Sequence, residues 1–201
     1  MIAKVPARQR ILDAAITLMW RNGYDGVSVD AICDAANVRK GSFYHAFASK
    51  EALLNAAIKR VWEHDRAEIE CCYADNSPPL LQFRNHLEWF GLTQRRLRAQ
   101  FGFVPGMFNM AAAMNAPQEA REISARASQE HGAILGQGVN AALAARQLSP
   151  AEVQWWSALV TQLINGAVIQ ARLSNSLAPF DTFPESVLAL MGLGRAPFDP
   201  P

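Results

Sequence analysis

Residues 28–53 constrain the fold of this chain more than any other stretch. Ser28 is a good helix N-cap, and the residues after it have the apolar spacing of a short helix that ends near Ala36. Asn37 falls where the chain must turn, and asparagine tolerates the left-handed conformation better than most residues. A second helix over 39–47 begins with two adjacent cations. The pattern predicts two short helices that meet at a tight turn.

Helical signals continue through the rest of the chain. Apolar spacing predicts helices over 8–22, 49–73, 78–100, 117–146, 150–173 and 182–191, with one or two further turns in 107–114. Capping-box patterns stand at Ser149–Glu152 and Thr182–Glu185, and Ser77 is expected to cap a helix that has Pro78 at its first position. No segment alternates as a strand does. We therefore predict an all-α fold of about nine helices.

Charge is distributed unevenly along the 201 residues, although the formal net charge is only +1. Residues 1–60 hold nine Lys or Arg against five Asp or Glu, whereas residues 61–201 hold ten against thirteen. A basic N-terminal part on a mildly acidic remainder fits a nucleic-acid contact confined to that part. We find no targeting segment, no membrane span and no spacing of cysteine and histidine typical of a metal site, so we expect a cytoplasmic protein without cofactor.

The helix pair has the arrangement of a helix-turn-helix unit, in which the second helix enters the major groove of DNA and its first residues meet base edges. On this pattern we predict base contacts from Arg39, Lys40, Ser42 and Phe43, and we expect Gly41 to let the backbone approach the DNA closely. Phosphate contacts are predicted for Ser28, Tyr44, His45 and Lys50. Two short helices with a basic pair also occur in other helical proteins, so the pattern alone leaves DNA binding as one of several interpretations.

The residue pattern of 8–54 is more specific than the helix pair alone. It includes Ile11 to Ala15, Gly23-Tyr24-x-Gly26-Val27-Ser28-Val29-x-x-Ile32, Ala36-Asn37-Val38-x-Lys40-Gly41-Ser42-Phe43-Tyr44 and Phe47-x-Ser49-Lys50-Glu51-x-Leu53. This stretch closely resembles the N-terminal domain of the TetR family of transcriptional regulators. Two positions depart from the usual family pattern, since Asn37 replaces a common glycine and Ala46 stands where a phosphate-contacting histidine is frequent.

The resemblance implies a homodimer that binds a palindromic operator, usually as a repressor, and that dissociates when a small molecule fills the C-terminal domain. We accordingly expect a three-helix DNA-binding domain over residues 1–48 and an effector-binding and dimerisation domain over 49–201, connected by the helix 49–73. The helix 150–173 is apolar nearly all round. We predict that it forms the dimer interface with the helix 182–191, with close approach at Gly166, Ala167 and Ala171.

The C-terminal part offers candidates for an effector pocket, because it holds more aromatic and thioether surface than a small core needs. These candidates are Trp89, Phe90, Phe103, Met107, Phe108, Met110, Trp155 and Trp156, with His131, Gln162 and Asn165 as the polar residues on otherwise apolar faces. Plain core packing is the competing interpretation of each. Gly132, Gly136 and Gly138 indicate places where another helix or a ligand approaches closely, with a local break of the helix as the alternative.

Three functional hypotheses follow. The first is a ligand-responsive dimeric repressor whose largely apolar effector is unknown. The second is a small all-α enzyme or carrier for an apolar compound, although no catalytic constellation is visible in the residue spacing and we expect no enzyme. The third is an activator built from the same parts. Whether Cys71 or Cys72 senses electrophiles or oxidants also stays open.

Overall fold

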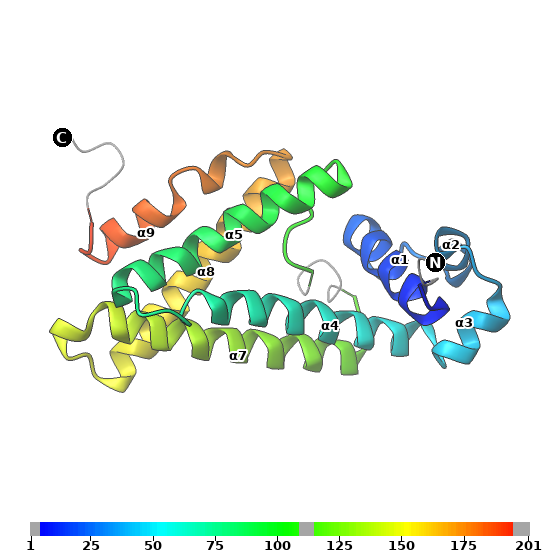
Figure 1. The fold of residues 1–201 in the computed structure, drawn as a ribbon, viewed down its shortest axis with the longest axis horizontal. Coiled ribbons are helices and arrows are strands. Elements are labelled where there is room, and N and C mark those ends of the chain that lie inside the picture. Colours follow the sequence, from blue (N-terminus) through cyan, green and yellow to red (C-terminus); the bar gives the residue numbers. More distant parts are fainter. Residues whose placement is uncertain (1–4, 109–114, 195–201) are drawn as a thin grey trace. The chain divides into compact units, whose positions relative to one another are not determined.

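The computed structural model describes residues 5–108 and 115–194, and these residues form α-helices and 3₁₀-helices but no strand. The all-α prediction is confirmed. The helices are α1 (Ala7–Asn22), α2 (Val29–Ala36), α3 (Lys40–Ala46), α4 (Lys50–Cys71), α5 (Pro79–Phe101), α7 (Gln118–Ala142), α8 (Pro150–Ser174) and α9 (Phe183–Leu190), with 3₁₀ turns at Ala144–Arg146 and Ala178–Phe180 (Figure 1). Most of the turns predicted over 107–114 lie outside the described residues. None of the described helices is long and apolar enough to cross a membrane.

The chain divides into two compact units. Unit 1 comprises Met1–His64 and Met107–Ala127, and unit 2 comprises Asp65–Gly106 and Ser128–Pro201. Helices α4 and α7 each begin in unit 1 and end in unit 2. The functional boundary that we expect at residue 48 stays a prediction.

In unit 1, α1 packs against α2 and α3. Asn37 adopts the left-handed conformation (φ 50°, ψ 56°) between α2 and α3, as predicted. The Arg10 guanidinium of α1 donates to the carbonyl oxygens of Ala36 (2.8 Å) and Asn37 (3.0 Å), so α1 holds this turn in place. The shared core contains Ile11, Leu12, Ala15, Met19, Ile32, Cys33 and Phe43.

In unit 2, glycines allow close packing on α7. A Cβ atom at Gly138 would collide with the ring of Tyr73 and lie 3.1 Å from Phe83, and one at Gly136 would lie 3.1 Å from the hydroxyl of Ser157. The predicted close approach is therefore confirmed at these two positions. A Cβ at Gly132 would meet no described atom within 4 Å.

The helix starts test three capping predictions. Ser149 forms the expected capping box with Glu152. The prediction for Ser77 is wrong, because its backbone N–H and hydroxyl both donate to the Asp75 carboxylate and α5 begins one residue later, with Pro78 as its cap. The Thr182 box is also wrong: Thr182 makes no side-chain cap bond, and Glu185 pairs with Arg84 at 2.5 Å.

The predicted helix 117–146 ends earlier, at Ala142, and a 3₁₀ turn follows it.

Candidate nucleic-acid interface

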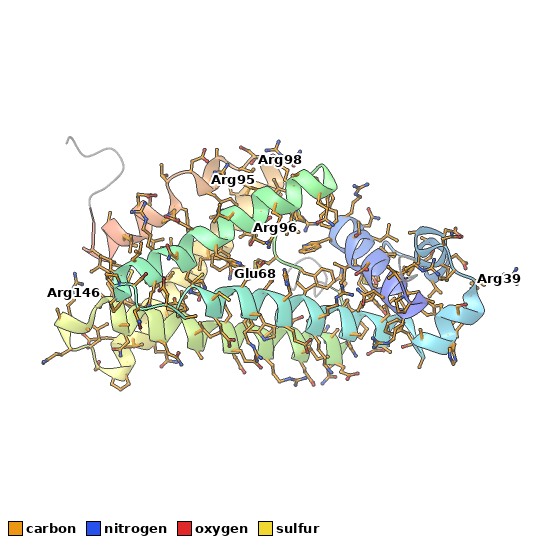
Figure 2. All side chains as sticks on the ribbon, viewed as in Figure 1. Arg39, Glu68, Arg95, Arg96, Arg98 and Arg146 are labelled. Atoms are coloured by element: carbon orange, nitrogen blue, oxygen red, sulfur yellow. The ribbon has the colours of Figure 1, made fainter. Side chains whose placement is uncertain are left out.

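Helix α3 exposes one continuous polar face. Figure 2 shows Arg39 at the start of α3, extending into solvent. The other exposed residues of this face are Lys40, Gly41, Ser42, Tyr44 and His45. A short helix with a cationic start and small or polar residues on its outer face has the shape and chemistry that a major groove accepts.

Phe43 does not belong to this face. Its side chain is fully buried, and its ring packs against Phe47 at a centroid distance of 6.3 Å and edge-on against Tyr44 at 5.2 Å. Phe43 and Phe47 lie four residues apart and so share the apolar side of this segment. The predicted base contact is corrected accordingly: Phe43 is a core residue of unit 1.

Lys40 is paired within the chain. Its ammonium lies 2.7 Å from the Asp30 carboxylate of α2, and the hydrogen bond and charge of Asp30 raise the pKa of Lys40. Both side chains are exposed, and water and salt screen an ion pair in that setting, so it contributes little to stability. A phosphate or base edge can therefore replace Asp30 at little cost.

Gly41 lies inside α3, where glycine costs about 1 kcal/mol relative to alanine. A Cβ atom added there would meet no described atom within 4 Å, so packing within the chain does not require glycine. Close approach of a DNA backbone to α3 would explain why glycine stands at this position. Gly41 also lines a surface hollow together with Ala7, Arg8, Ser42, His45 and Ala46.

Arg8 is a neighbour of this face that the sequence patterns did not single out. Its guanidinium lies 4.9 Å from the centroid of the Phe47 ring, and its side chain is exposed beside the hollow at α3. The apolar spacing of residues 8–22 indicates a helix, but it carries no information about which cation of that helix lies beside α3.

Two predicted phosphate contacts have structural roles as well. The hydroxyl oxygen of Ser28 accepts from the backbone N–H of Ala31 (3.0 Å), which confirms the cap and leaves its hydrogen to be donated. The Lys50 ammonium donates to the carbonyls of Tyr24 and Val27 (3.1 Å each) and lies 4.0 Å from the centroid of the Tyr24 ring. These two bonds use two of its three hydrogens, so one remains for an anion.

The segment that contains these helices matches a known protein family. Residues 11–57 match the family model described as bacterial regulatory proteins, tetR family. The N-terminal domain of this chain belongs to the TetR family.

Two curated relatives of this TetR-family domain are transcriptional regulators by name. The regulator UidR of Escherichia coli K12 is 45% identical over 53 residues, which are 26% of this chain and 27% of UidR. The repressor DhaR of a Mycobacterium strain, GP1, is 33% identical over 86 residues, 42% of this chain and 43% of DhaR. The chain thus matches less than half the length of these relatives.

Solved structures extend the likeness in fold beyond the TetR-family domain. The regulatory protein TetR from Rhodobacter sphaeroides superposes with a TM-score of 0.78 at 23% identity, covering 90% of this chain and 96% of that one. Reduced NemR of E. coli gives 0.72 at 21% identity, over 90% and 94% of the two chains. At these identities the agreement concerns the fold.

The predicted effector residues do not form one cluster. Trp89, Phe90 and His131 are buried in unit 2, together with half-buried Phe103, Trp156 and Asn165. Met107 and Phe108 belong to unit 1, where Phe108 packs edge-on against Trp20 at 5.2 Å. Met110 lies outside the described residues. Trp155 is 58% exposed and Gln162 is exposed, so neither lies in the interior of unit 2.

A groove of about 880 Å³ lies between α7 and α8. Gln162 lines it, but none of the predicted aromatic residues does. The described lining residues carry no charge, and they combine amides and hydroxyls such as Gln137, Asn140 and Thr161 with small residues.

His131 takes part in a buried polar chain. Its Nε2 atom lies 3.2 Å from Nε2 of His86, and Nδ1 of His86 lies 2.8 Å from the Tyr73 hydroxyl. Burial lowers the pKa of His86 to about 3, with a smaller effect from His131, and lowers that of His131 to about 4. Both imidazoles are therefore neutral near pH 7. The sequence did not point to His86, because its partner lies 45 residues away.

Proposed function

We propose that this protein is a ligand-responsive transcriptional regulator that binds a palindromic operator as a homodimer and acts as a repressor in the cytoplasm. The exposed polar face of α3 on a TetR-family domain is the observation that carries the proposal. Repression is favoured by the names of two relatives, the repressor DhaR and IcaR of Staphylococcus aureus, a negative transcriptional regulator.

In the proposed complex α3 enters the major groove. Arg39 and Lys40 contact base edges, and each good base contact contributes about 1–3 kcal/mol of discrimination between bases. Gly41 lets the DNA approach the backbone, and Ser42 lies on the same exposed face. Ser28, Tyr44, His45 and Lys50, to which we add Arg8, contact phosphates and so fix the orientation of α3.

The outward face of α8 supports a homodimer. Trp155, Ile169 and Leu173 are exposed large apolar residues, and by helical periodicity they lie opposite the buried Val160, Ile164 and Val168. Gly166 lies on the same outward face, where an added Cβ would meet no described atom within 4 Å. A second copy that packs its own α8 here would cover this apolar surface.

Two details refine the proposed interface. Leu190 of α9 is also exposed, so α9 can contribute to the same contact. Ala171 is fully buried within the chain, so the predicted close approach at this residue is corrected, while exposed Gly166 and half-buried Ala167 stay in the proposal.

Effector binding releases the protein from DNA only if the effector binds the released state more tightly than the DNA-bound state. We propose that α4 transmits the change, because it is one continuous helix that begins in unit 1 and ends in unit 2.

The experiment is a footprint on the DNA that flanks the protein's own gene, followed by fluorescence titration of the protected duplex. Lys40→Ala should weaken binding at least tenfold at moderate salt. Lys59→Ala, which removes an exposed cation from α4, is the matched control and should stay within twofold of wild type. Equal affinity of wild type and Lys40→Ala would remove Lys40 from the interface.

The same titration separates the alternatives. A small enzyme or carrier would show no salt-dependent affinity for DNA, whereas phosphate contacts require a steep fall with salt. An activator of the same architecture would bind more tightly when its effector is present.

A further inference from the structure

The carboxylate of Glu68, near the end of α4, is held by two side chains of α5. The indole N–H of Trp89 donates to one oxygen (2.9 Å), and the Arg96 guanidinium donates one N–H to each of the two oxygens (2.8 Å each). Figure 2 labels Glu68 and Arg96 on these two helices. All three residues belong to unit 2.

Trp89 and Arg96 together have the properties of a carboxylate site. They are seven residues apart, so they lie on the same side of α5, two turns from each other. The planar guanidinium matches the two oxygens of a carboxylate, and the indole N–H can only donate. Trp89 is 7% exposed, so its N–H requires an acceptor from the protein or from a ligand.

Two acids of α4, Asp65 and Glu68, lie near this site, and their surroundings differ. Asp65 lies one turn before Glu68, and burial raises its pKa to about 7, with Glu68 adding to the rise and Arg96 opposing it. Glu68, by contrast, accepts hydrogen bonds directly from the Arg96 fork and from the Trp89 N–H. The site therefore stabilises one carboxylate, and Glu68 supplies it.

We propose that Trp89 and Arg96 form the carboxylate-binding part of the effector site, and that an effector acts by putting its own carboxylate in the place of Glu68. This inference rests on the proposed function. The exchange leaves both donors of α5 paired, whereas a neutral effector could accept from the indole N–H but would leave the Arg96 guanidinium without its anion. The side chain of Glu68 is 27% exposed, so once displaced it can reach water.

The exchange would change how α4 is held. Two further ion pairs in these turns of α4 join Arg66 to Glu70 (3.6 Å) and to Glu130 (3.8 Å). Both are longer than the contact between Glu68 and Arg96, and their carboxylates are more exposed than that of Glu68. Loss of the Glu68 contact therefore loosens the last turns of a helix whose first residue, Lys50, is bound to the carbonyls of Tyr24 and Val27.

The binding test uses Glu68→Ala, which empties the site, and acetate as the probe. The indole ¹⁵N–¹H signals of the five tryptophans are recorded by NMR at constant ionic strength, and Trp89→Phe assigns the Trp89 signal. In Glu68→Ala, acetate should shift this signal saturably and at a concentration at least tenfold lower than in wild type. Glu68→Ala/Arg96→Gln should show no saturable shift, and Glu70→Ala should behave as wild type.

Absence of a saturable shift in Glu68→Ala, with the other four indole signals unchanged, would refute the proposal that Trp89 and Arg96 bind a carboxylate. If Glu68→Ala does not fold, Glu68→Gln replaces it, since its amide oxygen still accepts from Trp89 but carries no charge for Arg96. Acetate should then act at least threefold more tightly than on wild type, and equal affinity would overturn the site.

The regulatory part is tested on the duplex identified by footprinting. Glu68→Ala should bind it at least fivefold more weakly than wild type, while Glu70→Ala should match wild type. Unchanged affinity of Glu68→Ala would overturn the role of Glu68 in holding α4. Because the acetate titration contains no DNA, failure of wild type to bind DNA would contradict the proposed function and leave the carboxylate site standing.

Discussion

The Lys40 ammonium at the start of α3 lies 2.7 Å from the carboxylate of Asp30 in the first turn of α2. If Lys40 contacts DNA, Asp30 competes with the DNA for the same cation. Asp30→Asn should therefore raise affinity for DNA about threefold to tenfold and steepen the dependence of log affinity on log salt by roughly one unit of slope. Titrations at three salt concentrations measure both quantities. Glu63→Gln on α4 is the control, and a gain of the same size in that variant would show a general charge effect instead.

Gly41 separates stability from binding. Gly41→Ala adds a methyl group that meets no described atom within 4 Å, and it should stabilise the protein by about 0.5–1 kcal/mol because alanine favours the helix. The same methyl group should weaken DNA binding at least fivefold if the DNA backbone approaches α3 there. Urea unfolding and fluorescence titration test the two effects. A variant that is more stable and binds as well as wild type would refute the close approach.

Trp155 tests the interface on α8. A tryptophan that is 58% exposed on an apolar helix face is expected to be a major contributor to a contact between two copies. Trp155→Ser should shift the population toward monomer at micromolar concentration, as measured by analytical ultracentrifugation, while its circular dichroism stays that of wild type. Leu81→Ser, which removes an exposed apolar side chain from α5, should leave the association unchanged. A dimer of equal strength in Trp155→Ser would move the interface away from this residue.

The pair His86 and His131 predicts a loss of stability in mild acid. Their folded-state pKa values, about 3 and about 4, lie below the usual 6.5, so the unfolded chain binds more protons as the pH falls. Their contribution to stability is fully present above pH 6.5, starts to fall below that pH, and is completely lost only once the pH has fallen through the folded-state values. Each should lower the free energy of unfolding by about 2 kcal/mol between pH 7 and pH 5.

Urea unfolding at the two pH values measures this loss. His131→Phe should lose about half of the pH dependence, whereas His45→Gln, at an exposed position, should keep it. The same pH dependence in His131→Phe as in wild type would mean that the buried pair does not cause it.

Local chemistry explains which structural predictions succeeded. The cap at Ser28, the left-handed Asn37 and the capping box at Ser149 all depend on residues within about four positions of one another, so a single sequence contains the whole cause. The predicted cap at Ser77 is wrong for a local reason as well, because the Asp75 carboxylate, two residues earlier, binds the Ser77 hydroxyl.

Contacts distant in sequence explain the rest. Phe43 was assigned to the DNA face from its position in α3, whereas packing within unit 1 buries it, and its spacing from Phe47 was the signal that could have shown this. The pairs Glu68–Arg96 and His86–His131 join residues 28 and 45 positions apart. A single sequence does not show that such distant residues are in contact. The effector residues could therefore be predicted only by residue type, and they do not form one pocket.

The most direct test of the central claim is the affinity of wild type and Lys40→Ala for the footprinted duplex and for a scrambled duplex of equal length, each at several salt concentrations. The account predicts that wild type prefers the footprinted duplex, that its affinity falls steeply with salt, and that Lys40→Ala loses at least tenfold on that duplex. Equal affinity of wild type for the two duplexes, or an affinity that does not change with salt, would contradict it.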